Sequence, residues 1–138
     1  MRYRVVALGG GGSRMKSAAL RAACDEYLSR LKHYAKVEER DVLPKNGDSR
    51  FIALDIEGES WTSEQLADLT ARWDMEGRDV TFVIGDADGL PEAVRRSAER
   101  RWSLGPLTLP HELARVVVYE QLYRAYTIRR GEKYHRGG

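Results

Sequence analysis

The sequence predicts a single α/β domain, residues 1–138, in which helices cover both faces of a mostly parallel β-sheet. Short apolar runs alternate along the chain with patterns of helical period. Residues 80–84 are apolar except for Thr81, as is typical of a strand that helices cover on both faces. Because 138 residues fit one domain and no linker or internal repeat divides them, we expect one core.

The N-terminal half contains three predicted strands and one long helix. Residues 4–8 form an apolar strand, which the four glycines at 9–12 bring to an end. A helix over about residues 14–34 follows, because an apolar stripe recurs at steps of three and four residues: Leu20, Cys24, Tyr27 and Leu31. Residues 37–43 are a possible strand ended by Pro44 and the turn signal Asn46-Gly47, and residues 51–56 are a stronger one.

The C-terminal half alternates in the same way. Thr62 begins a helix whose capping box Gln65 completes, and Gly77 ends this helix. After the strand at 80–84, Pro91 begins a helix that we expect to reach about Trp102. Residues 104–109 are predicted to be extended, and the last helix runs from Pro110 to about residue 128. The tail is basic and rich in glycine, which predicts a mobile end on which folding depends little.

The net charge of +2 is distributed unevenly along the chain. Residues 1–54 carry a net charge of +5, residues 55–92 carry −9, and residues 95–138 carry +6. If the two ends meet in space they form a basic surface that attracts polyanions, although solvated helix faces explain the pattern equally well. Cys24 is the only cysteine, so an intrachain disulfide is excluded. No apolar run reaches the roughly 18 residues of a membrane span, and we expect a cytoplasmic protein with no membrane partner.

Ligands of open α/β sheets bind beyond the carboxyl ends of the strands, which makes the loops after Leu8, Ile56 and Ile84 candidates. The glycine run at 9–12 lacks the residues of a P-loop and of the dinucleotide fingerprint, so a strand–helix connection is favoured over a phosphate site. Gly85 permits close approach of a ligand to the backbone. Asp86 and Asp88 are better explained by a tight turn than by a metal ion, and we expect no metal site.

Residues 104–110 are unusual for a connection, since they contain three leucines, one glycine and two prolines. The prolines stiffen the segment, and Gly105 permits close approach. Such a segment is suited to line an apolar pocket with exposed backbone groups, which is the environment that an adenine ring prefers. A connection that only packs on the core remains the alternative.

Several stretches together carry a family resemblance. The most specific are Leu107-Thr108-Leu109-Pro110-His111-Glu112-Leu113-Ala114-Arg115-Val116 and Glu120-Gln121-Leu122-Tyr123-Arg124-Ala125. Trp102-Ser103-Leu104, Phe82-Val83-Ile84-Gly85, Asp88-Gly89-Leu90, Leu54-Asp55 with Gly58, and Tyr134-His135-Arg136 match in the same order. Nearly the whole chain thus resembles the ribosomal large-subunit pseudouridine methyltransferases of the RlmH type, which belong to the SPOUT class.

This resemblance implies a C-terminal trefoil knot, a homodimer, and S-adenosylmethionine as the methyl donor. It implies methylation of N3 of a pseudouridine in the helix 69 hairpin of 23S rRNA, on the assembled ribosome. The implied cofactor contacts are Leu54, Gly85, Leu104, Gly105, Pro106, Leu107, Thr108 and Leu109. The alternatives are an enzyme of the same class that acts on another RNA, such as tRNA, and a non-catalytic RNA-binding α/β module.

Two features depart from the family's pattern. A second glycine usually follows Gly85, and here Asp86 replaces it, so its side chain either crowds the cofactor or points to solvent. Relatives carry a helix between the strands that correspond to residues 37–43 and 51–56, whereas about seven residues connect them here. A parallel crossover needs a dozen or more residues, so these strands pair differently or the first is not a regular strand.

Methyl transfer to N3 requires loss of its proton, so we expect a base or a cation that favours the anion. The candidates are Tyr134, His135, Arg136 and Arg115. Arg115 has an alternative role as the partner of Glu112 or Glu120 on the helix surface. An aromatic ring, an imidazole and a guanidinium together have little structural use at a chain end, so we expect the tail to contact substrate in a site that the partner subunit completes.

Overall fold

The computed structural model describes residues 1–9, 14–45, 49–86 and 88–136, and strands and helices alternate through them. The elements are β1 (Arg2–Ala7), α1 (Ala18–Leu31), β2 (Lys36–Arg40), β3 (Ser49–Ser60), α2 (Ser63–Glu76), β4 (Asp79–Ile84), α3 (Glu92–Ser97), β5 (Arg100–Ser103) and α4 (His111–Arg129).

All five strands belong to one sheet in the order β2-β1-β4-β3-β5, and each neighbouring pair is parallel. The predicted parallel α/β architecture is confirmed. Because the strands are parallel, their carboxyl ends share one edge of the sheet. At that edge β4, β3 and β5 are neighbours, so the segments that follow them converge.

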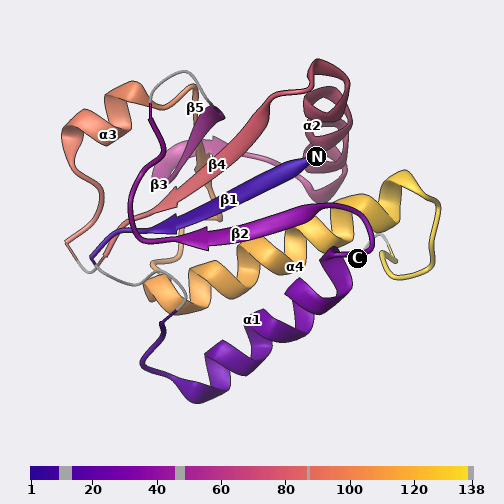
Figure 1. Cartoon of the computed structure of the whole chain (residues 1–138), viewed down its shortest axis with the longest axis horizontal. Helices are drawn as coiled ribbons and strands as arrows, with labels where there is room; N and C mark the ends of the chain where they lie inside the picture. The colour runs from indigo at the N-terminus through magenta and orange to yellow at the C-terminus, as the bar shows by residue number, and fades with distance from the viewer. Residues whose placement is uncertain (10–13, 46–48, 87, 137–138) are drawn as a thin grey trace.

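Helices cover the two faces of the sheet unequally. Tyr3, Ile52 and Phe82 point to one face, where they share a buried core with residues of α1, α2 and α4. The long helix α4 packs against both α1 and α2. Val6 and Val83 are fully buried on the opposite face. The short helix α3 contacts β3 and lies on the other side of the sheet from α1 and α4 (Figure 1).

The sequence signals at the ends of α2 are confirmed. Thr62 and Gln65 exchange both hydrogen bonds of the capping box. Gly77 ends the helix in the left-handed conformation, with φ of +71°. The ends of α1 differ from the prediction, because the hydroxyl of Ser17 accepts a hydrogen bond from the backbone of Leu20 and starts the helix at Ala18.

The strand order explains how so short a segment connects β2 to β3. β2 is regular but lies at the sheet edge beside β1, whereas β3 pairs with β4 and β5, so the two strands do pair differently. The chain must move three strand positions sideways and return along the sheet, roughly 20 Å in all. Eight extended residues reach about 27 Å, so no helix is required.

One predicted element was wrong. The helix expected from Pro91 to about Trp102 ends at Ser97, and Arg100–Ser103 form β5 against β3. A four-residue strand that contains two arginines shows no alternation of apolar and polar residues from which it could be predicted. Its pairing with β3 therefore determines that Arg100–Ser103 form a strand. Within the described residues, no helix is long and apolar enough to cross a membrane, and no group of three or more His, Cys, Asp or Glu is placed to share a metal ion.

Candidate cofactor pocket

A pocket of about 630 Å³ lies where the middle of β3, at residues 54–56, meets the segments that follow β4 and β5. Seven of the eight residues predicted to contact a cofactor line it: Leu54, Gly85, Leu104, Gly105, Leu107, Thr108 and Leu109. Pro106 belongs to the same segment but does not line the pocket. The size falls in the range of about 300–1,000 Å³ that is usual for small-molecule and cofactor sites.

The wall after β5 depends on a local turn at Gly105. Its φ of +122° is a conformation that residues with a side chain rarely adopt. The hydroxyl of the buried Ser103 accepts a hydrogen bond from the Gly105 N–H at 3.2 Å and donates one to its carbonyl at 3.1 Å. This turn directs residues 107–109 along the pocket, where Leu107 is 78% exposed.

Gly85 is required by the packing of its own loop. A Cβ atom at this position would lie 2.6 Å from the carbonyl carbon of Gly89, because the backbone at Gly89 comes back over Gly85. Any residue with a side chain at position 85 therefore displaces the loop, and a valine displaces it further. Loss of cofactor binding in such a variant would not by itself demonstrate contact with the ligand.

Several residues line the pocket that the sequence did not single out as contacts. Trp102 is buried and stacks on Trp61, with ring centroids 5.1 Å apart. The sequence predicted a helix up to about residue 102, so it did not place Trp102 in a strand beside the pocket. The remaining residues come from strand ends and from the start of α4: Asp55, Ile56, Ile84, Asp86, Gly89, Leu90, Pro110, His111 and Ala114.

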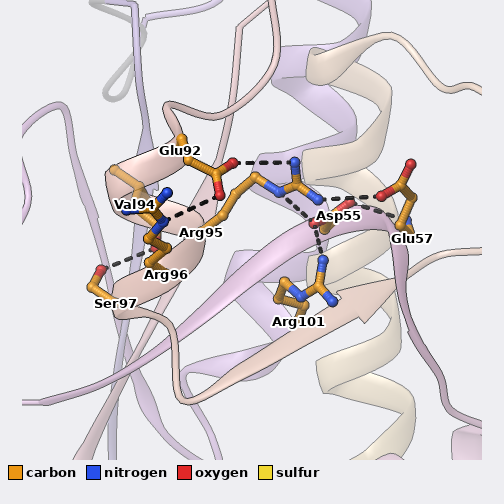
Figure 2. Close-up of polar contacts among 8 residues, drawn as sticks. All are labelled: Asp55, Glu57, Glu92, Val94, Arg95, Arg96, Ser97 and Arg101. Carbon is orange, nitrogen blue, oxygen red and sulfur yellow. Dashed lines mark hydrogen bonds and ion pairs between the residues drawn. The ribbon is translucent and has the colours of Figure 1, made fainter.

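The carboxylate of Asp55 lies between two guanidinium groups at the wall of the pocket. Arg95 of α3 is 2.9 Å away and Arg101 of β5 is 3.0 Å away, as Figure 2 shows. Burial opposes ionisation of Asp55, but the Glu57 N–H and the two arginines outweigh it and hold the pKa of this carboxyl below its usual value. Asp55 thus joins β3, β5 and α3 beside the pocket.

Asp86 is exposed, but its own loop holds its carboxylate in place. Its Oδ1 accepts a hydrogen bond from the Asp88 N–H at 2.9 Å, and its Cβ lies against Gly9 of the loop after β1. The predicted tight turn at Asp86 is therefore present. Residues 10–12 of the glycine run lie outside the described residues, so the phosphate alternative is not tested there.

The predicted catalytic residues of the tail lie away from the pocket of their own chain. Tyr134 packs edge-on against Tyr123 of α4 with centroids 4.7 Å apart, and its hydroxyl donates to Glu120 at 2.7 Å. His135 lies between Arg124 and Glu64 of α2, at 3.0 and 3.1 Å. Arg124 is roughly 20 Å along α4 from His111 at the pocket.

This placement affects the chemistry that each tail residue offers. Burial, followed by the hydrogen bond to Glu120, raises the pKa of Tyr134 well above its usual value, which disfavours the phenolate form. A guanidinium only donates hydrogen bonds, so Nδ1 of His135 accepts from Arg124. Arg136 is exposed. Tyr134 and His135 thus contact α4 and α2, whereas the sequence had suggested an end without structural contacts.

Arg115 is buried, with 2% of its side chain exposed. It forms an ion pair with Glu39 of β2 at 3.2 Å, and its charge also contributes to lowering the pKa of Glu112. Glu39 also accepts from the hydroxyl of Tyr119 at 2.6 Å and pairs with Arg21 of α1. The Arg115 side chain thus joins α4 to β2 and α1, and the structure does not bring it into the pocket.

Glu112, in the first turn of α4, holds the start of α1. Its carboxylate accepts hydrogen bonds from the backbone N–H groups of Lys16 at 2.7 Å and Ser17 at 3.1 Å. The Lys16 bond is the main cause that lowers the pKa of this carboxyl. Glu112 therefore joins the two helices, in addition to the favourable interaction of its charge with the N-terminal end of the α4 dipole.

Comparisons with known proteins agree on one family. A family model described as a predicted SPOUT methyltransferase matches residues 42–135. A ribosomal RNA large subunit methyltransferase H from Thermus thermophilus is 43% identical, with 99% of each chain covered. One of the same name from Sorangium cellulosum is 42% identical over 97% of this chain and 99% of the relative. Another from Hahella chejuensis is 47% identical over 75% of this chain and 68% of the relative.

Solved structures agree at the level of the fold. A probable methylase family protein from Haemophilus influenzae superposes with a TM-score of 0.61 at 11% identity, covering 98% of this chain and 70% of that one. A putative methylase family protein from Neisseria gonorrhoeae gives 0.61 at 13% identity, covering 88% and 81%.

Proposed function

Because the chain belongs to the SPOUT methyltransferases, within the ribosomal RNA large subunit methyltransferase H family, we propose that it methylates 23S rRNA with S-adenosylmethionine as donor. The observation that carries this proposal is the pocket, where residues 54–56 of β3 and the loop after β4 meet the leucine-rich segment after β5. The finer proposal is transfer to N3 of a pseudouridine in the helix 69 hairpin, by a cytoplasmic homodimer acting on the assembled ribosome.

The pocket fits this cofactor in size and in chemistry. Leu104, Leu107 and Leu109 supply apolar surface for the flat faces of an adenine ring. The turn at Gly105 places backbone beside that surface. When bound, S-adenosylmethionine supplies a methyl group carried by a positively charged sulfur. The residues of the chain hold the ligand, position it and exclude water, and most of the rate gain is positional. The trefoil knot that the family implies stays a prediction.

The nucleophile must lose its N3 proton as the new carbon–nitrogen bond forms, and the electrons of the broken carbon–sulfur bond remain on sulfur. We assign the tail, with Tyr134, His135 and Arg136, to the pocket of the partner subunit. The support is distance, because the tail lies roughly 20 Å along α4 from the pocket of its own chain. Arg136, which is exposed, is suited to favour the N3 anion or to meet a phosphate.

The test is transfer of a labelled methyl group from S-adenosylmethionine to ribosomes, free 23S rRNA and tRNA, followed by mapping of the label. We expect label in ribosomes, at one pseudouridine. Label in tRNA alone would support the other RNA substrate, and no label in any RNA would contradict the enzymatic function.

A matched pair of variants connects this activity to the pocket. Leu107→Glu places a charge on the apolar wall, and we expect loss of cofactor binding by about tenfold or more because the charge must be desolvated. Met75→Glu makes the same change at an exposed residue of α2 that does not line the pocket. Calorimetry should show unchanged binding for Met75→Glu. If both variants bind the cofactor with equal affinity, the pocket is not the cofactor site on which the activity depends.

A further inference from the structure

Asp86 is held at the wall of the pocket by its own loop. It follows β4 directly and is one of the residues that line the pocket. Its Oδ1 accepts from the Asp88 N–H, and its carbonyl accepts from the Gly89 N–H, both at 2.9 Å. On the other side its Cβ packs on Gly9, where any side chain would collide with it. The carboxylate therefore has a defined position beside the space where a ligand binds.

The charge of Asp86 is not balanced by a neighbouring cation in the described part of the chain. Asp55, the other acidic residue of the pocket wall, is paired with Arg95 and Arg101 at 2.9 and 3.0 Å. No ion pair of the described residues includes Asp86, whose Oδ1 is bonded only to a backbone N–H. Asp86 is thus a negative charge that remains available to a cationic ligand.

The strand order places this charge at a useful distance from the apolar wall. Residues 104–109 follow β5 and Asp86 follows β4, with β3 between them. Two strand spacings amount to about 10 Å. A ligand whose uncharged adenine packs on residues 104–109 can therefore reach Asp86 with its other end. In S-adenosylmethionine that end carries a sulfonium, an ammonium and a carboxylate, and its net charge is +1.

We propose that Asp86 recognises the positively charged methionine end of the cofactor. This inference rests on the proposed function and adds a specificity-determining residue to it. Attraction by Asp86 scales with the positive charge of the ligand, and it is weaker for S-adenosylhomocysteine, which has lost the charge on sulfur. The same residue thereby favours exchange of product for a new cofactor molecule.

The test compares three ligands by calorimetry at low ionic strength. S-adenosylmethionine carries both cationic groups, S-adenosylhomocysteine carries only the ammonium, and 5′-methylthioadenosine carries neither. The variant is Asp86→Asn, which keeps an oxygen to accept from the Asp88 N–H and so preserves the turn. The matched control is Asp88→Asn, which removes the same charge two residues away at a side chain that does not line the pocket.

We expect Asp86→Asn to weaken binding of S-adenosylmethionine by about threefold to tenfold, of S-adenosylhomocysteine less, and of 5′-methylthioadenosine not at all. Added salt should reduce the difference in affinity between wild type and Asp86→Asn, because salt screens the interaction between charges. Asp88→Asn and wild type should agree for all three ligands. Three outcomes would overturn this inference without affecting the proposed function. Asp86→Asn binds as wild type does, Asp86→Asn loses the same affinity for all three ligands, or Asp88→Asn shows the same loss as Asp86→Asn. If wild type binds neither S-adenosylmethionine nor S-adenosylhomocysteine, the proposed function fails with it.

Discussion

Asp55 illustrates how single side chains hold the pocket wall. It lies in the middle of β3 with only 9% of its side chain exposed, and it accepts hydrogen bonds from Arg95, Arg101 and the backbone of Glu57. Hydrogen bonds to a charged group contribute about 1.5–3 kcal/mol each when partly buried, before the cost of desolvation is deducted. The β3–β5–α3 junction therefore depends on a charge, and its stability depends on pH (Figure 2).

Asp55→Asn should lower the thermal stability most at neutral pH. The pKa of Asp55 in the folded chain is lower than its usual value of 3.8, so ionised Asp55 stabilises the fold at pH values above about 4. This stabilisation is lost as the pH falls through the folded-state pKa. The difference in Tm between wild type and variant should correspond to about 1–2 kcal/mol at pH 7 and decrease below pH 4. A difference that is constant from pH 7 to pH 3 would contradict this assignment.

Gly85→Ala should destabilise the fold, by about 1–3 kcal/mol in urea unfolding, because its Cβ collides with the backbone of Gly89. Gly105→Ala serves as the comparison, because it adds the same methyl group without a collision. No described residue lies within 4 Å of a Cβ at Gly105, so this variant should lose only about 1 kcal/mol of unfolding free energy, from the strain of a positive φ. If Gly85→Ala unfolds at the same urea concentration as wild type, the close approach at Gly89 is not required.

At the scale of elements, α4 organises the molecule. Its buried residues face α1, α2 and the sheet, its first residue lines the pocket, and its last turns receive the tail. The contact of α4 with β2 is polar, because Arg115 and Tyr119 both meet Glu39. An edge strand that is short and rich in charge is thereby attached to the core.

Glu39→Gln should cost about 2–4 kcal/mol of unfolding free energy, because the buried Arg115 loses its carboxylate. Glu38→Gln is the matched control on the same strand. Glu38 is equally buried, at 14% exposed against 12%, but its partners Arg2, Lys36 and Arg40 are at least 42% exposed. Exposed pairs contribute about 0–1 kcal/mol. Equal losses in the two variants, measured by urea unfolding, would contradict the role of Arg115.

For the whole molecule, the separation of tail and pocket is the main consequence of the fold. Within one chain, residues 134–135 lie on α4 and on the start of α2, and the pocket lies at the other end of α4. In a homodimer that places the tail of one subunit beside the pocket of the other, the two parts of the site would come together. Solution scattering at micromolar concentration should therefore give the mass of a dimer.

Mixed dimers test the arrangement directly. Chains with Leu107→Glu have no working pocket, and chains that lack residues 134–138 have no tail, so each should be inactive alone. When the two are mixed and refolded together, about a quarter of wild-type activity should return, because half the dimers then contain one complete site. Activity that stays absent after mixing would place the tail and the pocket in the same subunit, or exclude the tail from catalysis.

Local patterns in the sequence determined the α/β class, the cap residues of α2, the buried strand β4 and two parts of the pocket wall, at Gly85 and at residues 104–110. These features follow from hydrophobic period and turn chemistry, which act between residues near in the chain. The resemblance of motifs identified the family, because Leu107–Val116 and the closing Tyr134-His135-Arg136 are specific.

Tertiary structure alone decided the rest. β5 exists because β3 offers it backbone partners, and not because Arg100–Ser103 favour a strand. The partner of Arg115 is Glu39, from a strand distant in sequence, where nearer acids had been the alternatives. The position of the tail on α4 and α2 is likewise set by contacts such as Glu64 with His135. Each of these depends on the free energy of pairing and burial between segments far apart in the chain, which no local pattern encodes.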